Sequence, residues 1–308
     1  MNELNFSRIL LITDGSLLAT TTEQTALNFA LRFGSSVDVV DVIRKPYFGE
    51  KWIHTQIEST LATLAEEKHK HLNNVAKSFK DAGVSQVNLQ ILEGKSSIEI
   101  AKYVLQHNID VVIRYRKGAA SKRTGPVGQT AYQLLGSCPV PVLLVAPSSP
   151  VTPDRVLACV DVYDETSLNK KIVDMACFVK TDREEQPSLL YCWDWFGHEF
   201  LKHRMNAQEY EEITKRLEAE QRQKLRDLAV ALNLNPDHPG VKLLFGSAQY
   251  AIPEYANQQK FDLVVMSTVA PRSLGNKLLG STIDNTIQRL DCSLLAIKPD
   301  GFVSPVTT

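Results

Sequence analysis

The stretch Arg8-Ile-Leu-Leu-Ile-Thr-Asp14 occurs a second time in the chain, as Arg155-Val-Leu-Ala-Cys-Val-Asp161. Each copy is a short apolar run that follows an arginine and ends on an aspartate. The copies lie 147 residues apart (155 − 8), and a later pair around Asp110 and Asp262 repeats at 152 residues (262 − 110). A pattern that recurs at a nearly fixed spacing indicates a duplicated structural unit. The drift in spacing predicts an insertion in the second copy, near 182–187.

Both copies continue as short apolar runs that alternate with helical patterns. The runs predict strands, and because the apolar residues of the first-half runs are continuous, we expect both faces of those strands to be buried. The predicted strands are 8–13, 37–43, 87–92, 110–114 and 140–146 in the first half, and 155–160, 188–193, 241–245, 262–267 and 293–297 in the second. The predicted helices include 21–33, 55–82, 96–107, 127–136 and 205–232. Repeated β-α units require parallel strands, so each half is predicted to be a doubly wound α/β domain with a five-stranded parallel sheet.

A segment rich in proline and serine separates the two halves. It reads Pro147-Ser-Ser-Pro-Val-Thr-Pro153, and proline cannot extend a central strand. The chain has 308 residues, whereas one domain usually has roughly 100–200. We therefore predict two domains, residues 1–148 and 152–308.

Charge and hydrophobicity argue against several classes of partner. The formal net charge is −1 and no basic cluster stands out, so a nucleic-acid partner is not expected. The first seven residues lack the basic flank and apolar core of a secretory signal, and no run approaches the ~18–20 apolar residues of a membrane span. These features predict a cytoplasmic protein without a membrane partner.

The residue types that bind metals or attack substrates form no recognisable site. The cysteines contain no Cys-x-x-Cys pair and are predicted to be small buried hydrophobic residues. Cys192, Asp194, His198 and His203 lie close in sequence, but two histidines five residues apart do not share a helix face as zinc-binding pairs do. Neither a metal site nor a catalytic triad is predicted.

The order of these elements, with the motifs at their ends, resembles the universal stress protein family, and in particular its tandem, E-type members. The resemblance rests on motifs in both halves: Asp14-Gly-Ser16, Pro139-Val-Pro-Val-Leu-Leu-Val145, Leu278-Leu-Gly-Ser281 and Cys292-Ser-Leu-Leu-Ala-Ile-Lys-Pro299. It implies two Rossmann-like domains of the adenine-nucleotide alpha hydrolase-like type. It also implies pairing through the final strands, so that 140–145 and 293–297 meet and the domains pack as an internal pseudo-dimer.

ATP-binding members of this family carry Gly-x-x-Gly, nine residues, and then Gly-Ser or Gly-Thr. The glycines let backbone N–H groups approach phosphate, and the following helix N-terminus favours an anion. Here the first half reads Tyr115-x-x-Gly118 and then Gly128-Gln129, and the second reads Ser267-x-x-Ala270 and then Gly280-Ser281. Both loops are degraded relative to that pattern, so ATP is a cofactor whose binding we expect to be weakened.

The candidate nucleotide or anion site comprises Asp14, Gly118 and Gly128 in the first half, and Asp161, Ser267, Ala270, Gly280, Ser281 and Thr282 in the second. In the family, the aspartate that ends the first strand lies beside the nucleotide, which implies that role for Asp14 and Asp161. A turn or helix-capping role is the alternative. If either half binds ATP, we expect the second to do so, because Tyr115 would crowd the phosphates in the first.

The resemblance implies a protein of the bacterial stress response. Because the loops are degraded and no nucleophile has a recognisable setting, we predict a non-catalytic binding or signalling protein rather than an enzyme. Two alternatives stay open: a weak ATP-binding switch or ATPase in the second half, and a carrier of a small apolar or lipid-like ligand. The carrier hypothesis rests on aromatic residues after the second strand of each half, Tyr47, Phe48 and Trp52 and then Trp195, Phe196 and Phe200.

Overall fold

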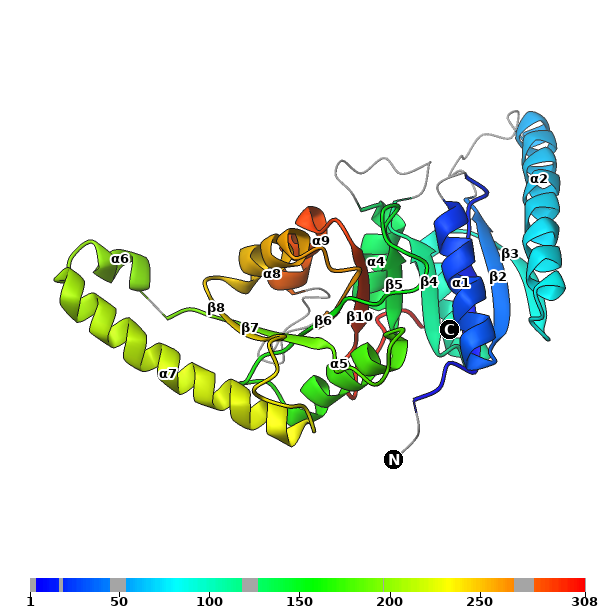
Figure 1. The fold of residues 1–308 in the computed structure, drawn as a ribbon. Helices are drawn as coiled ribbons and strands as arrows, with labels where there is room; N and C mark the ends of the chain where they lie inside the picture. The colour runs from blue at the N-terminus through cyan, green and yellow to red at the C-terminus, as the bar shows by residue number, and fades with distance from the viewer. Residues whose placement is uncertain are drawn as a thin grey trace. The chain divides into compact units, whose positions relative to one another are not determined.

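The computed structural model of the chain describes residues 4–16, 19–44, 54–117, 127–195, 197–268 and 280–307. The chain divides into two compact units (Figure 1). Domain 1 comprises Met1–Thr152 together with Ser293–Thr308, and domain 2 comprises Pro153–Cys292. Several residues singled out in the sequence lie outside the described residues: Tyr47, Phe48, Trp52, Gly118, Phe196 and Ala270.

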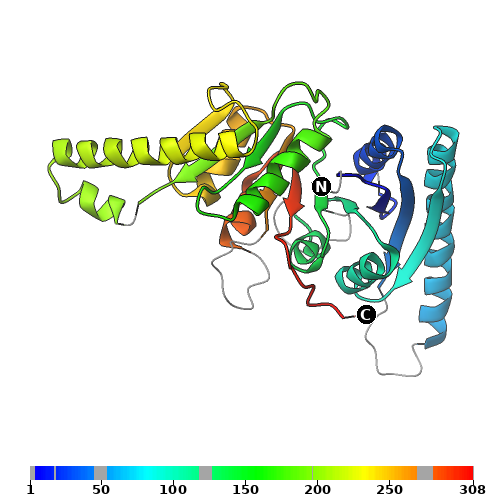
Figure 2. The same cartoon turned by 90° about the horizontal axis from the view of Figure 1, so that it is seen from below.

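Domain 1 is a doubly wound α/β sheet with the strand order β3-β2-β1-β4-β5-β10. Strands β1 to β5 are parallel, as predicted, and β10 runs antiparallel to β5. Helices α3 and α4 contact each other on one face of the sheet, and α1 lies on the other (Figure 2). The elements are β1 (Arg8–Ile12), α1 (Thr20–Phe33), β2 (Ser36–Ile43), α2 (His54–Asp81), β3 (Val87–Glu93), α3 (Ser96–His107), β4 (Val111–Tyr115), α4 (Gln129–Ser137), β5 (Val142–Val145) and β10 (Ser293–Ile297).

Domain 2 repeats this arrangement with the strand order β9-β6-β7-β8, all parallel where the register is defined. Four of the five strands predicted for the second half therefore lie in domain 2, and the fifth, β10, belongs to domain 1. Helices α8 and α9 contact each other. The elements are β6 (Val156–Cys159), α5 (Thr166–Val179), β7 (Ser188–Trp193), α6 (His198–Lys202), α7 (Ala207–Ala231), β8 (Val241–Phe245), α8 (Ala248–Gln258), β9 (Leu263–Ser267) and α9 (Ser281–Arg289).

The inner strands of both sheets are buried on both faces, but the outermost strands are not. Every residue of β5, β6 and β10 is buried. In β3 and β8, exposed residues such as Asn88 and Lys242 alternate with half-buried ones. The prediction of two buried faces is therefore wrong for β3, which lies at the edge of the sheet.

The repeated arginine and aspartate form the same contact in each domain. The carboxylate of Asp110 accepts a hydrogen bond from the backbone N–H of Arg8 at 2.8 Å, and that of Asp262 accepts one from the N–H of Arg155 at 2.8 Å. Each contact ties the start of the fourth strand of a half to the start of its first strand. This shared contact gives a structural reason for the repeated aspartates, Asp110 and Asp262.

The last strand of the chain completes the sheet of domain 1. Leu294 and Ala296 of β10 stand opposite Leu144 and Val142 of β5. Antiparallel pairing covers the backbone groups that an edge strand would leave open. The segments 140–145 and 293–297 therefore adjoin, while the packing of the two domains as a pseudo-dimer stays a prediction.

The two longest helices, α2 and α7, are amphipathic. The C-terminal half of α2 buries Leu72, Val75 and Phe79 at helical spacing. On α7, ion pairs at i,i+4 such as Lys215–Glu211 lie on the exposed side. Within the described part of the chain, no helix combines the length and the apolar character that a membrane crossing needs.

Candidate functional site

Each domain has a pocket at the carboxyl ends of its parallel strands. Doubly wound sheets bind their ligands at this edge. The pocket of domain 2 has a cavity volume of about 120 Å³, and the pocket of domain 1 has one of about 300 Å³. We call them the domain 2 pocket and the domain 1 pocket.

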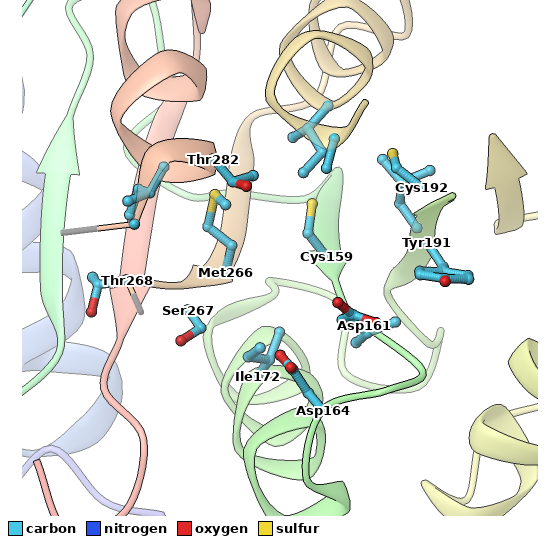
Figure 3. A pocket seen from close by; sticks show the side chains of 16 residues that line it. Cys159, Asp161, Asp164, Ile172, Tyr191, Cys192, Met266, Ser267, Thr268 and Thr282 are labelled. Carbon is cyan, nitrogen blue, oxygen red and sulfur yellow. The ribbon is translucent and has the colours of Figure 1, made fainter. Parts of the chain in front are cut away.

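The domain 2 pocket is lined mainly by apolar side chains. Cys159, Cys192 and Met266 stand at the ends of β6, β7 and β9, and Figure 3 shows their sulfur atoms on the same side of the strands. Ile252 from α8 and Ile283 from α9 close the cavity. Unbranched and sulfur-containing side chains adapt readily to an apolar guest. The remaining lining residues are Val160, Asp161, Asp164, Ile172, Leu190, Tyr191, Ala248, Ser267, Thr268, Gly280 and Thr282.

The two thiols in this pocket are poor nucleophiles. Burial raises the pKa of Cys192 to about 12 and raises the pKa of Cys159 well above its ordinary value. Because the thiolate is the reactive form, both cysteines stay protonated near neutral pH. Among the described residues, no group of three or more His, Cys, Asp or Glu side chains could hold a metal ion.

Four of the predicted second-half residues line the domain 2 pocket: Asp161, Ser267, Gly280 and Thr282. The carboxylate of Asp161 accepts a hydrogen bond from the backbone N–H of Tyr163 at 3.0 Å, so it also serves the turn after β6. Gly280 is the N-cap of α9, with φ −69° and ψ 148°. Ser281 is the first residue of that helix, and its side chain lies outside the described part.

Of the aromatic residues predicted after β7, the structure describes Trp195 and Phe200, and neither lines the domain 2 pocket. The ring of Trp195 packs against that of Tyr210 on α7, with centroids 5.6 Å apart. Phe200 is 56% exposed and lies under the guanidinium of Arg204. These contacts of Trp195 and Phe200 give no support to an apolar ligand at this place.

The domain 1 pocket carries charged side chains in place of the apolar ones. Arg44, Lys68 and Arg114 line it together with the carboxylates of Asp14 and Asp41. The remaining lining residues are Ile12, Thr13, Val42, Ile43, Leu64, Ser96, Gly128, Gln129 and Thr130. Among the described lining residues, three cations and two carboxylates leave an excess of one positive charge.

Of the predicted first-half residues, Asp14 and Gly128 line the domain 1 pocket. One carboxylate oxygen of Asp14 accepts hydrogen bonds from both the backbone N–H and the hydroxyl of Ser16, at 3.2 and 2.6 Å. Asp14 therefore caps a turn and also lines the pocket, while its place beside a nucleotide stays a prediction. Tyr115, which we expected to crowd this space, is 7% exposed and is not among the described lining residues.

Three of the charged side chains that line the domain 1 pocket, Lys68, Asp41 and Arg44, contact specific partners. Lys68 forms an ion pair with the buried carboxylate of Asp41. The guanidinium of Arg44 donates to the hydroxyl of Thr130 at 3.0 Å, which links the end of β2 to the first turn of α4. Arg114 differs, because its Nε is enclosed in the protein and has no hydrogen-bond partner among the described residues.

A second polar cluster adjoins the same pocket. The hydroxyl of Thr13 donates to the carboxylate of Glu23 at 2.6 Å, and Nε2 of His71 lies 3.0 Å from the same oxygen. The hydrogen bond with Glu23 raises the pKa of His71, against the opposing effect of burial. His71 thus carries its proton more readily than a free histidine does.

The two pockets occupy equivalent places in the two domains. At the end of the first strand of each half, corresponding residues lie 147 positions apart (159 − 12). The spacing is 150 at the second strand (191 − 41). It is 152 at the fourth strand (266 − 114) and at the final helix. Equivalent backbone bonds support this alignment: Gly94 donates to Ile43 at 2.9 Å and Gly246 to Trp193 at 2.8 Å. The equivalent lining pairs are Ile12/Cys159, Thr13/Val160, Asp14/Asp161, Asp41/Tyr191, Val42/Cys192, Ser96/Ala248, Arg114/Met266, Gly128/Gly280 and Thr130/Thr282.

Sequence reasoning missed the residues that set the character of each pocket. Arg114 and Met266 occupy the same position on the fourth strand of their halves. A signal for Arg114 was present, because a charged residue interrupts the apolar run of a central strand. Asp41 interrupts the apolar run of β2 in the same way, but its pairing with Lys68 has no such signal, since 27 residues separate the two along the chain.

Comparisons with known proteins agree with the fold and its duplication. The Haemophilus influenzae "Universal stress protein E homolog" is 24% identical over 241 residues, which cover 76% of this chain and 76% of that relative. A functionally unknown protein from Pseudomonas aeruginosa PAO1 superposes with a TM-score of 0.73 at 18% identity, covering 96% of this chain and 93% of the other. A universal stress protein from Archaeoglobus fulgidus gives a TM-score of 0.66 at 17% identity, covering 96% and 99%. At these low sequence identities, the structural similarity shows the fold alone.

The family model of the universal stress protein family matches twice, over residues 5–146 and 153–298. The two matches correspond to the two halves of the sequence repeat. The chain therefore belongs to the universal stress protein family, with two Rossmann-like domains of that family in tandem.

Proposed function

We propose that this protein acts in the stress response by binding a small molecule without transforming it, and that the domain 2 pocket receives the apolar part of that molecule. Its membership of the universal stress protein family fits a stress-response role. The single observation that carries the proposal is the apolar lining of a pocket placed at the carboxyl ends of β6, β7 and β9.

The size and chemistry of the domain 2 pocket support this function. Its volume of about 120 Å³ is below the roughly 300–1,000 Å³ of pockets for drug-sized ligands. It therefore suits a small apolar group or the end of an alkyl chain. The protonated thiols of Cys159 and Cys192 favour binding over nucleophilic chemistry.

The test is to fill the pocket from a helix that borders it. Ala248 lines the pocket from the first turn of α8, so Ala248→Leu places extra methyl groups in the cavity. Gln258→Leu, at the exposed end of the same helix, is the control. We expect calorimetry with decanoate to show binding to the unmodified protein and to Gln258→Leu, and at least tenfold weaker binding to Ala248→Leu. Equal affinity in all three proteins would refute the assignment.

An ATP-binding switch in domain 2 is the second candidate. It is favoured by Gly280 and Thr282, which line the pocket at the N-terminus of α9, where backbone N–H groups favour phosphate. The matched variants are Gly280→Val and the equivalent Gly128→Val in domain 1, each checked for folding. Loss of ATP–Mg²⁺ binding in Gly280→Val alone would support the switch. No binding at millimolar ATP would exclude it and leave the apolar-ligand proposal intact.

A further inference from the structure

Three sulfur-bearing side chains line the domain 2 pocket, one from each of three neighbouring strands. The register of β6 and β9 runs up to the residues directly before Cys159 and Met266, so these two residues stand side by side. Cys159 also pairs with Leu190 of β7, and Cys192 lies two residues beyond Leu190. Because side chains alternate along a strand, Cys159, Cys192 and Met266 lie on one face of the sheet (Figure 3). We call these three residues the sulfur trio.

The sulfur trio belongs to domain 2 and not to the fold that the two domains share. The equivalent positions in domain 1 hold Ile12, Val42 and Arg114, and none of these side chains contains sulfur. The trio is also invisible as a sequence motif, because its first and last members, Cys159 and Met266, are 107 residues apart (266 − 159). Only the pairing of β6 with its two neighbours brings the three side chains together.

The charge around the sulfur trio favours a cation. Among the described residues that line the domain 2 pocket, the charged ones are Asp161 and Asp164, and both are acidic. Carboxylates at a pocket raise the local concentration of positive ions. The described lining of the domain 1 pocket has an excess of one positive charge, so the two pockets differ in the sign of the ion that they attract.

The chemistry of the three sulfur atoms narrows the choice of cation. Thiols and thioethers are soft ligands, which suit Cu(I), whereas Mg²⁺ and Ca²⁺ prefer oxygen. A thioether argues against Zn²⁺, whose protein ligands are thiolate, imidazole and carboxylate. Burial raises the pKa of both thiols, so each thiolate that forms must first lose a tightly held proton. A monovalent ion needs only one thiolate for neutrality, and an uncharged complex suits an apolar cavity.

We propose that the domain 2 pocket binds one Cu(I) ion through Sγ of Cys159, Sγ of Cys192 and Sδ of Met266. Binding forms one copper–thiolate bond and releases one proton to solvent, while the other thiol and the thioether donate lone pairs. This site goes beyond the proposed function, because the ion needs the sulfur atoms, whereas an apolar ligand needs only the space. Both would occupy the same cavity of about 120 Å³, so each should exclude the other.

The test removes sulfur atoms without changing the apolar character of the pocket. Met266→Leu conserves volume, a change that protein cores tolerate, and deletes the thioether. Cys192→Val introduces the side chain that Val42 provides at the equivalent place in domain 1. Cys177→Val is the matched control, because it removes a half-buried thiol of α5 that is not among the described lining residues. All variants are checked for folding, and Cu(I) is titrated without oxygen in competition with bicinchoninate.

We expect the unmodified protein and Cys177→Val to take up one Cu(I) ion with the same affinity. The affinity should fall about 100-fold in Cys192→Val and about tenfold in Met266→Leu, since a thioether is the weaker ligand. X-ray absorption at the copper edge should find sulfur atoms as the nearest neighbours of the metal. Decanoate should bind Cys192→Val and Met266→Leu as it binds the unmodified protein, which separates the copper site from the apolar-ligand proposal.

Three outcomes would overturn the copper site. One is that the unmodified protein takes no Cu(I) from bicinchoninate. Another is equal Cu(I) affinity in Cys177→Val and in either trio variant, which would place the ion elsewhere on the protein. The third is nitrogen or oxygen atoms as the nearest neighbours of copper. Each of these results leaves the apolar-ligand proposal standing, and failure of decanoate to bind would refute that proposal and leave the copper site intact.

Discussion

The domain 1 pocket and the domain 2 pocket occupy equivalent places, but the first is lined by several charged side chains and the second mainly by apolar ones. Nine pairs of equivalent residues line both. Where domain 1 has the Asp41–Lys68 ion pair, domain 2 has a hydrogen bond from the hydroxyl of Tyr191 to Gln221 at 3.3 Å. Where domain 1 has Arg114, domain 2 has Met266. The fold thus fixes the place of a pocket, and a few side chains decide which molecules it accepts.

The largest expected effect is that of placing a charge in the domain 2 pocket. Met266→Arg copies Arg114 into a mainly apolar cavity in which Tyr191 takes the place of the Asp41 carboxylate, and Met266 is only 5% exposed. We expect a loss of about 3–5 kcal/mol in the free energy of unfolding, the cost of an uncompensated buried charge. Met266→Leu, the control, should lose less than about 1.5 kcal/mol. Urea unfolding measures both, and equal stability of the two variants would show that the pockets do not differ in character.

The next effect concerns the ion pair that domain 2 lacks. Lys68→Gln introduces the residue found at the corresponding place in domain 2, but it leaves the carboxylate of Asp41, 4% exposed, without its cation. We expect a loss of about 1–3 kcal/mol. Lys70→Gln, on the exposed side of the same helix, should be nearly neutral. A double-mutant cycle with Asp41→Asn should show coupling, and strictly additive losses would contradict the pairing.

A matched pair of glycines tests the shared backbone itself. Gly94 and Gly246 have φ of 138° and 128°, a region that residues with a Cβ rarely adopt. Gly94→Ala and Gly246→Ala should each cost about 1–2 kcal/mol for that reason. The loss should be larger at Gly94, whose added Cβ would lie 3.0 Å from Cγ of Glu99, whereas Gly246 has nothing within 4 Å. Thermal unfolding of both variants checks the order, and a neutral result at either glycine would argue against equivalent turns.

The smallest effect is a pH dependence that only domain 1 should show. Because the pKa of His71 is raised above 6.5 in the folded protein, its contribution to stability is full below about pH 6.5 and is lost as the pH rises through the folded pKa. His71→Gln should remove this contribution, about 0.2–1 kcal/mol for a partly exposed pair. His69→Gln, at an exposed position of the same helix, should keep it. Unfolding curves at pH 5.5 and 8 separate the variants, and an unchanged pH dependence in His71→Gln would assign it to another group.

The sequence by itself determined the duplication, the order of the elements and most of their bounds. Strand runs such as 8–13 and 188–193 and helices such as 96–107 lie within about one residue of the observed elements, because periodicity and turn residues are local signals. The family resemblance pointed to Asp14, Asp161, Gly128 and Gly280, and all four line the pockets, where the ends of parallel strands and the starts of helices meet.

Only the tertiary structure decided what those pockets contain. The pairing of Asp41 with Lys68, and the projection of Arg114 and Met266 into equivalent cavities, depend on which strand faces which helix across the sheet. The exposure of β3 was also decided by the tertiary structure. This strand has apolar residues, but it lies at the edge of the sheet, so its side chains are less covered than those of the inner strands. Contacts between residues far apart in sequence leave no local pattern. The energy of such a contact depends on groups that come together only when the chain folds.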